Sequence, residues 1–215
     1  MILQDLHNHT YFSYDSSLKP EDIIENAILN KIDIIGISDH QFSIKSDIFK
    51  YTKKIESLKE KYKGKIDIKC GLEIGTRPMP NDLILSSLKN IDYCLFESLD
   101  DLRSLDFYEF MQWVKLFKMR VGFAHTDIFK LEEHYNFDIL SYMRENNIFW
   151  EINTSGNYTY YYDFLTNPEK QKRVSKRGIE ISIGSDTHTL TSFNINKLKS
   201  CHELLLKLGN PIIFS

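Results

Sequence analysis

Histidine and carboxylate residues follow several apolar runs of this chain. His7 and His9 come directly after the first run, which contains Ile2, Leu3 and Leu6. Other apolar runs also end in such residues, namely His40, Glu73, His125, Asp186 and His188. Five of the seven histidines therefore lie where a strand is expected to stop. Side chains of these types at strand ends are what the metal centre of a β/α barrel requires.

The spacing of the first and last motifs allows each of them to bind one ion through two side chains. Residues i and i+2 of a strand point to the same side, so His7 and His9 can reach one ion. Asp186 and His188 have the same spacing. The first and last strands of a barrel are neighbours, so the two pairs can meet. Asp15 follows closely enough for its loop to fold it back toward them.

The complete set of candidate ligands is too large for one zinc ion, which takes about four. The set is His7, His9, Asp15, His40, Glu73, His125, Asp186 and His188. It fits two or three divalent ions, and Glu73 is well suited to bridge two of them. Mixed nitrogen and oxygen donors favour zinc, iron or manganese over magnesium or calcium. Asp186 or His188 could also shuttle a proton as a catalytic residue where it is not fully engaged as a ligand.

Strand-like and helix-like segments alternate from end to end and must position these residues. The predicted strands are Ile2–Leu6, Ile32–Ser38, Ile66–Ile74, Ile91–Phe96, Arg120–Ala124, Ile148–Ile152, Ile179–Ile183 and Pro211–Phe214. Helical patterns begin at Pro20 and cover Phe49–Tyr62, Asn81–Leu88, Leu105–Met119, Glu132–Asn146, Pro168–Arg177 and Ile195–Leu208. The repeat predicts one α/β domain over residues 1–215 with a parallel sheet. Seven or eight units favour a closed barrel, and Asn153–Thr166 is predicted to be a long loop at its active face.

Composition narrows the class of protein. The chain has 215 residues, of which 42% are hydrophobic and 27% charged, with a net charge of −3. No basic block suggests a nucleic-acid partner, although a metal site could act on a nucleotide. No apolar run is long enough to predict a membrane span, and the N-terminal strand does not look like a signal peptide. Cys70, Cys94 and Cys201 are far apart and odd in number, so we expect no disulfides and a cytoplasmic location.

Further polar residues have expected roles near or away from the centre. Asn153 ends the sixth strand and is a candidate for substrate contact, and Arg77, Arg173 and Arg177 are weaker candidates for holding a phosphate, because most arginines are solvated. We expect Asp39 to orient a ligand histidine, and Asp127 to cap a helix. His134 and His202 lie among charged neighbours and are predicted to be exposed.

Together the motifs resemble those of the PHP (polymerase and histidinol phosphatase) superfamily. They are His7-Asn8-His9-Thr10, Asp15, Ser38-Asp39-His40, Gly71-Leu72-Glu73, Ala124-His125 and Ser185-Asp186-Thr187-His188, with Glu151 to Gly156 similar to the histidinol-phosphatase branch. The resemblance implies a distorted (β/α)7 barrel with a metal site at the C-terminal ends of the strands. It also implies a di- or trinuclear centre at which a metal-activated water hydrolyses a phosphate monoester of a small metabolite or nucleotide.

The chain departs from the family pattern in two places. Family members with three metals usually have a further histidine after the fourth strand, where this chain has Glu97 to Asp100. Asp100 or Glu97 would have to replace that histidine. Histidinol phosphatases tend to have an arginine where this chain has Asn157 and Tyr158, so the resemblance does not extend to histidinol phosphate as the substrate.

Two other functions are compatible with the motifs. An amidohydrolase-like metal hydrolase also has a His-x-His motif after its first strand, but it often uses a bridging lysine, and no lysine ends a middle strand here. A non-catalytic PHP-like binding subunit is the other alternative, although such a protein would be expected to have lost ligands. The sequence predicts neither the substrate nor the oligomeric state.

Overall fold

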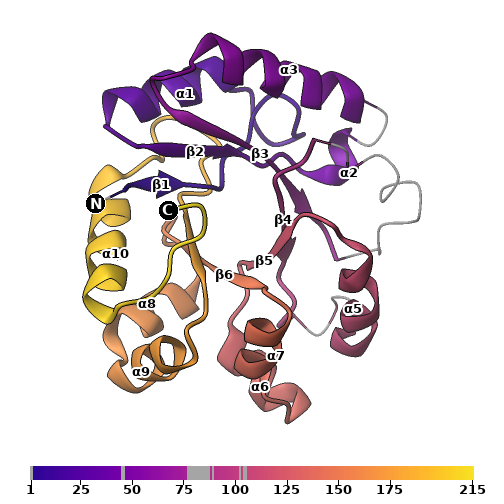
Figure 1. Ribbon diagram of the computed structural model, residues 1–215, viewed down its shortest axis with the longest axis vertical. Helices are drawn as coiled ribbons and strands as arrows, with labels where there is room; N and C mark the ends of the chain where they lie inside the picture. The colour runs from indigo at the N-terminus through magenta and orange to yellow at the C-terminus, as the bar shows by residue number, and fades with distance from the viewer. Residues whose placement is uncertain (1, 45–46, 77–87, 89, 102, 104–105) are drawn as a thin grey trace.

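A computed structural model describes the chain except for residues 1, 45–46, 77–87, 89, 102 and 104–105. Within the described residues, seven parallel strands follow one another in sequence order around a central axis (Figure 1). The strands are β1 (Gln4–Asp5), β2 (Ile34–Ile37), β3 (Asp67–Ile74), β4 (Tyr93–Glu97), β5 (Arg120–Ala124), β6 (Phe149–Asn153) and β7 (Ile181–Gly184).

Backbone hydrogen bonds close this sheet into a barrel. The backbone nitrogen of Leu6, the residue after β1, donates a hydrogen bond to the backbone oxygen of Ile183 in β7 at 2.9 Å. Beyond the strands, Asp186 N donates to His7 O at 2.8 Å. The first and last motifs of the chain are therefore adjacent, and the predicted (β/α)7 barrel is confirmed.

Helices surround the strands on the outside of the barrel, as Figure 1 shows. They are α1 (Pro20–Leu29), α2 (Gln41–Ile44), α3 (Ile48–Lys61), α5 (Phe107–Trp113), the 3-10 helix η1 (Val114–Leu116), α6 (Ile128–Tyr135), α7 (Ile139–Glu145), α8 (Thr159–Thr166), α9 (Pro168–Arg177) and α10 (Ile195–Leu208). Their apolar faces bury the outer side of the sheet, while a smaller apolar cluster fills the barrel interior. None of the described helices is long and apolar enough to cross a membrane.

Two large aromatic side chains fill the interior beneath the strand ends. Tyr93 and Phe149 are fully buried there, and each lies against a strand glycine. A Cβ atom on Gly71 would lie 2.3 Å from Tyr93 Cζ, and one on Gly122 would lie 2.1 Å from Phe149 Cε2. Only glycine leaves room for these rings, which form an apolar floor for the polar residues above.

The predicted eighth strand does not form. In the segment Pro211–Phe214, only Ile212 makes a bridge, to Ile181 of β7. The neighbouring side chain of Ile213 is fully buried in the interior cluster. The β-branched residues of this segment therefore close one end of the barrel instead of adding a unit to it.

Several predicted helices differ from those observed. The predicted helix Glu132–Asn146 is divided into α6 and α7, because Asn136 ends α6 in a left-handed conformation and Asp138 caps α7 by accepting a hydrogen bond from Ser141 N. The predicted helix Leu105–Met119 contains the shorter α5 and then tightens into η1. Most of the predicted helix Asn81–Leu88 lies outside the described residues.

The predicted loop Asn153–Thr166 contains helix α8. Three of its side chains, Tyr160, Tyr161 and Phe164, are buried on one helical face. This spacing is the ordinary signal of an amphipathic helix, and the high tyrosine content of the segment obscured it. The three cysteines are buried and unpaired, as expected.

Candidate metal centre

Polar side chains gather at the carboxyl ends of the strands, which meet at one face of the barrel. We call the following set the donor cluster: His7, His9, Asp15, His40, Glu73, Glu97, His125, Glu151, Asp186 and His188. The described residues contain four overlapping groups of these side chains, and in each group one donor atom per residue lies within 4.8 Å of the others. The structure thus brings together all the predicted ligands except Asp100.

The first group consists of His7, His9 and Asp186, from the two ends of the chain. The Nε2 atoms of His7 and His9 face each other at 3.0 Å. Asp186 Oδ1 lies 3.4 Å from His9 Nε2 and 3.7 Å from His7 Nε2. Glu73 Oε2 approaches the same nitrogen of His9 at 3.3 Å. Two imidazole nitrogens and two carboxylates therefore converge on one point.

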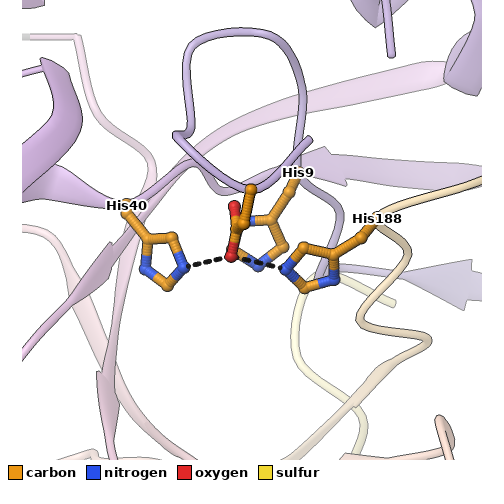
Figure 2. A group of neighbouring side chains, drawn as sticks. His9, His40 and His188 are labelled. Carbon is orange, nitrogen blue, oxygen red and sulfur yellow. Dashed lines mark hydrogen bonds and ion pairs between the residues drawn. The ribbon is translucent and has the colours of Figure 1, made fainter. Parts of the chain in front are cut away.

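The second group consists of His9, Asp15, His40 and His188. Figure 2 shows the three histidine rings converging, with dashed lines from His40 and His188 to one carboxylate oxygen. This oxygen is Oδ2 of Asp15, at 3.1 Å from His40 Nε2 and 3.0 Å from His188 Nε2. The loop after β1 does fold Asp15 back toward the centre.

The third group is Glu73, Glu97 and His125, from the ends of three adjacent strands. His125 Nδ1 lies 3.6 Å from Glu73 Oε1, and His40 Nδ1 lies 3.0 Å from Glu73 Oε2. Glu73 thus presents one oxygen to His125 and the other to His9 and His40. This position is the one a bridging carboxylate needs.

Two residues of the donor cluster have left-handed backbone conformations. His125 has φ 50° and Asp186 has φ 55°. Residues other than glycine adopt this region at a cost of about 1–3 kcal/mol, and such residues gather at functional sites. Both lie just beyond a strand, where the turn directs their side chains toward the centre.

The interior of the donor cluster contains polar atoms without hydrogen-bond partners. These buried atoms are Glu73 Oε1, Glu73 Oε2, His40 Nδ1, His125 Nε2 and Asp186 Oδ1. A buried polar atom without a partner typically costs about 1–3 kcal/mol, and more when the group is charged. Since carboxylate oxygens and imidazole nitrogens are donors to divalent transition metals, bound cations would satisfy all of these atoms together.

The electrostatics of the cluster show how its carboxylates are balanced when no ion is bound. Burial alone would raise the pKa of Glu73, but the neighbouring histidines, chiefly His7 and His125, hold it well below its usual value. Burial likewise opposes protonation of His7, yet Glu151, Glu73 and Asp186 raise its pKa well above the usual value. In the metal-free protein, protons on imidazoles are therefore the charges that balance the carboxylates.

Glu151 of β6 is a residue that the sequence analysis did not select. It is almost completely buried, and its Oε1 lies 2.5 Å from His7 Nδ1. A carboxylate accepts a hydrogen bond, so Nδ1 of His7 carries a proton, and Nε2 is the nitrogen that faces the centre and could bind an ion. The signal was present, because Glu151 is an acidic residue inside an apolar run, as Glu73 is.

Replacing Glu151 by glutamine is expected to weaken metal binding by about 10- to 100-fold, the usual cost of losing a partner of a ligand histidine. Glutamine has nearly the same size but lacks the charge that favours the required tautomer of His7. A titration of metal-free protein with zinc measures the change, and Glu203→Gln, an exposed change on α10, is the matched control. Unchanged affinity in Glu151→Gln would show that Glu151 only fills space.

Other predicted residues lie away from the donor cluster. The carboxylate of Asp100 lies 3.0 Å from Lys130 Nζ, and Glu97 occupies the position beside Glu73 instead. Arg173 pairs with Glu132. Arg77 is outside the described residues.

Arg177 and Asn153 lie on different sides of the barrel. Arg177 ends α9 before β7 begins, at the strand end opposite the cluster, and it contacts Asp138. Asn153 is fully buried, and its Nδ2 lies 3.4 Å from Glu151 Oε2. The contact of Asn153 is thus with a partner of His7.

The remaining polar residues differ in how far they follow expectation. Asp39 accepts a hydrogen bond from Ser13 Oγ at 2.7 Å, and Ser13 Oγ lies 3.2 Å from His9 Nδ1. Asp127 caps α6 as predicted. His202 was predicted to be exposed, which is wrong: it is fully buried, and burial lowers its pKa. Its Nε2 lies 3.0 Å from both the backbone nitrogen and the backbone oxygen of Gln4. His134 is exposed, as expected.

Comparisons with known proteins identify the family. No curated protein sequence matches the chain significantly. Among solved structures, the chain is similar to histidinol phosphate phosphatase from Lactococcus lactis subsp. lactis, which was crystallised with zinc, L-histidinol and phosphate. The match has 20% sequence identity and a TM-score of 0.65, and it covers 98% of this chain and 95% of the other. The PHP domain model matches residues 5–208, and the chain therefore belongs to the PHP domain family.

Proposed function

We propose that this protein is a metal-dependent phosphoesterase that hydrolyses a phosphate monoester of a small metabolite or nucleotide. The observation that carries the proposal is the set of buried donor atoms on Glu73, His40, His125 and Asp186, which make no hydrogen bond and face other members of the donor cluster. Membership of the PHP domain family supports it. So does the fold shared with a phosphatase crystallised with zinc and phosphate.

The donor cluster has enough ligands for two or three ions. His7, His9 and Asp186 would hold one ion, and Asp15, His40 and His188 another. Glu73 lies between these groups and would be shared. Divalent ions bound in this way lower the pKa of water and neutralise charge on a phosphate.

The residue best placed to move a proton between the site and solvent is His188. Its side chain is 32% exposed, whereas those of His7 and His40 are 0% and 9% exposed. His188 Nδ1 lies 3.0 Å from the backbone oxygen of Asp186, which fixes the ring orientation. We therefore assign His188, with Asp186 beside it, to proton transfer to the leaving alkoxide in the state in which Nε2 of His188 does not bind an ion.

The proposal is tested by phosphate release. Protein stripped of metal is reloaded with zinc, iron(II) or manganese(II), and p-nitrophenyl phosphate, sugar phosphates and nucleoside monophosphates are supplied. We expect release with at least one metal and none from the stripped protein. Protein that holds two or more ions per chain but releases no phosphate from any of these compounds would contradict the proposal.

A further inference from the structure

The donor groups of the centre differ in chemistry. One group has three histidines and one aspartate (His9, Asp15, His40, His188). The group His7, His9 and Asp186 has two imidazoles and one carboxylate. By contrast, the group Glu73, Glu97 and His125 has two carboxylates and a single imidazole.

We infer that the group of Glu73, Glu97 and His125, here called the oxygen-rich position, is where manganese(II) competes best with zinc, so that the centre takes two kinds of ion. This inference rests on the proposed metal-dependent function. Imidazole suits zinc, whereas carboxylate oxygens suit harder ions such as manganese. Zinc generally binds more tightly than manganese, and the donor set determines how large this difference in affinity is.

The backbone places Glu97 at this position. Glu97 is the last residue of β4 and pairs in register with Ala124 of β5, the residue before His125. The backbone oxygen of Glu97 accepts a hydrogen bond from Thr76 Oγ1 at 3.1 Å. Adjacent strands thus hold Glu97 and His125 side by side.

The side chain of Glu97 reaches the group over a glycine. A Cβ atom on Gly75 would lie 3.1 Å from Glu97 Oε1, closer than most such contacts. The carboxylate therefore lies against bare backbone at the end of β3. Among the described residues, it shares one candidate metal group with Glu73 and His125.

The partners of Glu97 supply the second, independent observation. Both carboxylate oxygens of Glu73 are buried and make no hydrogen bond, and their neighbours are imidazole nitrogens: Oε1 lies 3.6 Å from His125 Nδ1, and Oε2 lies 3.0 Å from His40 Nδ1. Glu73 is fully buried, and the side chain of His125 is 7% exposed. In the metal-free protein, protonated histidines offset the charge of Glu73, and an ion bound between Glu73 and Glu97 would take over that role.

Metal competition tests the inference. Metal-free wild type and variants are equilibrated in buffers that hold free manganese at the same fixed excess over free zinc. Bound metals are counted by mass spectrometry, and bound manganese is also measured by electron paramagnetic resonance. We expect the wild type to retain zinc and about one manganese per chain. In Glu97→His, an imidazole replaces the carboxylate, and the manganese-to-zinc affinity ratio should fall by at least about tenfold.

Three further variants separate the outcomes. Glu97→Gln removes the charge with little change of size and should also lose manganese. Glu109→Gln, on the exposed side of α5, should behave as wild type. Asp100→Asn should retain the wild-type metal ratio, and a loss of manganese there instead of in the Glu97 variants would overturn the inference. An identical metal ratio in wild type and Glu97→His would do so as well.

Failure of the inference can be told apart from failure of the proposed function. A changed metal ratio in Glu97→His, with no phosphate release from any metal-loaded protein, would support the inference about the oxygen-rich position and contradict the proposed phosphoesterase function. Phosphate release by the wild type, with an unchanged metal ratio in Glu97→His, would support the proposed function and contradict the inference about the oxygen-rich position.

Discussion

Replacement of Asp186 by asparagine is expected to lower kcat/KM for a phosphate monoester by more than about 100-fold and to remove at least one bound ion per chain. Loss of an outer partner of a ligand typically costs about 10- to 100-fold, and loss of a direct ligand should exceed that. Asp186 Oδ1 lies 3.4 Å from His9 Nε2, and Oδ2 lies 3.3 Å from His125 Nε2. One carboxylate thus faces two of the donor groups.

Asparagine is the appropriate substitute because of the backbone at this position. Asp186 has φ 55°, a left-handed conformation that asparagine adopts more readily than alanine. The fold should therefore survive, which circular dichroism and thermal unfolding would verify. Asp138→Asn, at an exposed ion pair with Arg177, is the control and should keep full activity and metal content. Full retention of both by Asp186→Asn would mean that the centre lies elsewhere.

Much of the barrel and of the donor cluster could be predicted because local patterns determine them. Alternation along a strand places His7 and His9 on one side, and the strand–helix repeat brings both ends of the chain together. An acidic residue inside an apolar run predicted that Glu73 is buried, and the same rule applied to Glu151 would have found the partner of His7.

The positions of Asp100 and Arg177 could not be predicted, because the first depends on a turn and the second lies at the opposite end of the barrel. Beyond β4, Ser98 has φ 54° and turns the chain, so that Asp100 reaches Lys130 while Glu97 stays beside Glu73. A sequence does not reveal such a left-handed residue when it is not glycine. Arg177 precedes its strand, and residues that precede parallel strands lie at the face opposite the site.

Metal removal is expected to lower the melting temperature, and the loss should grow as pH rises from about 6.5 to about 9. A ligand at 100 times its Kd stabilises a protein by about 2.7 kcal/mol per site. For a chain of this size each kcal/mol corresponds to about 2–4 °C, so one site accounts for about 5–11 °C. Scanning calorimetry of chelated and metal-loaded protein at several pH values measures the difference.

The pH dependence follows from the histidines of the metal-free form. Burial disfavours protonated His40, but Glu73 and Asp15 outweigh it and raise its pKa to about 9. A raised histidine pKa contributes stability that is complete below the unfolded value of about 6.5 and is lost as pH rises through the folded value. Over that interval the metal-free protein loses the protons that balance its buried carboxylates, whereas bound ions keep their charge. A metal-induced shift in melting temperature that stays constant from pH 6.5 to 9 would contradict this account, because it would mean that protons on His40 and its neighbours do not substitute for the ions.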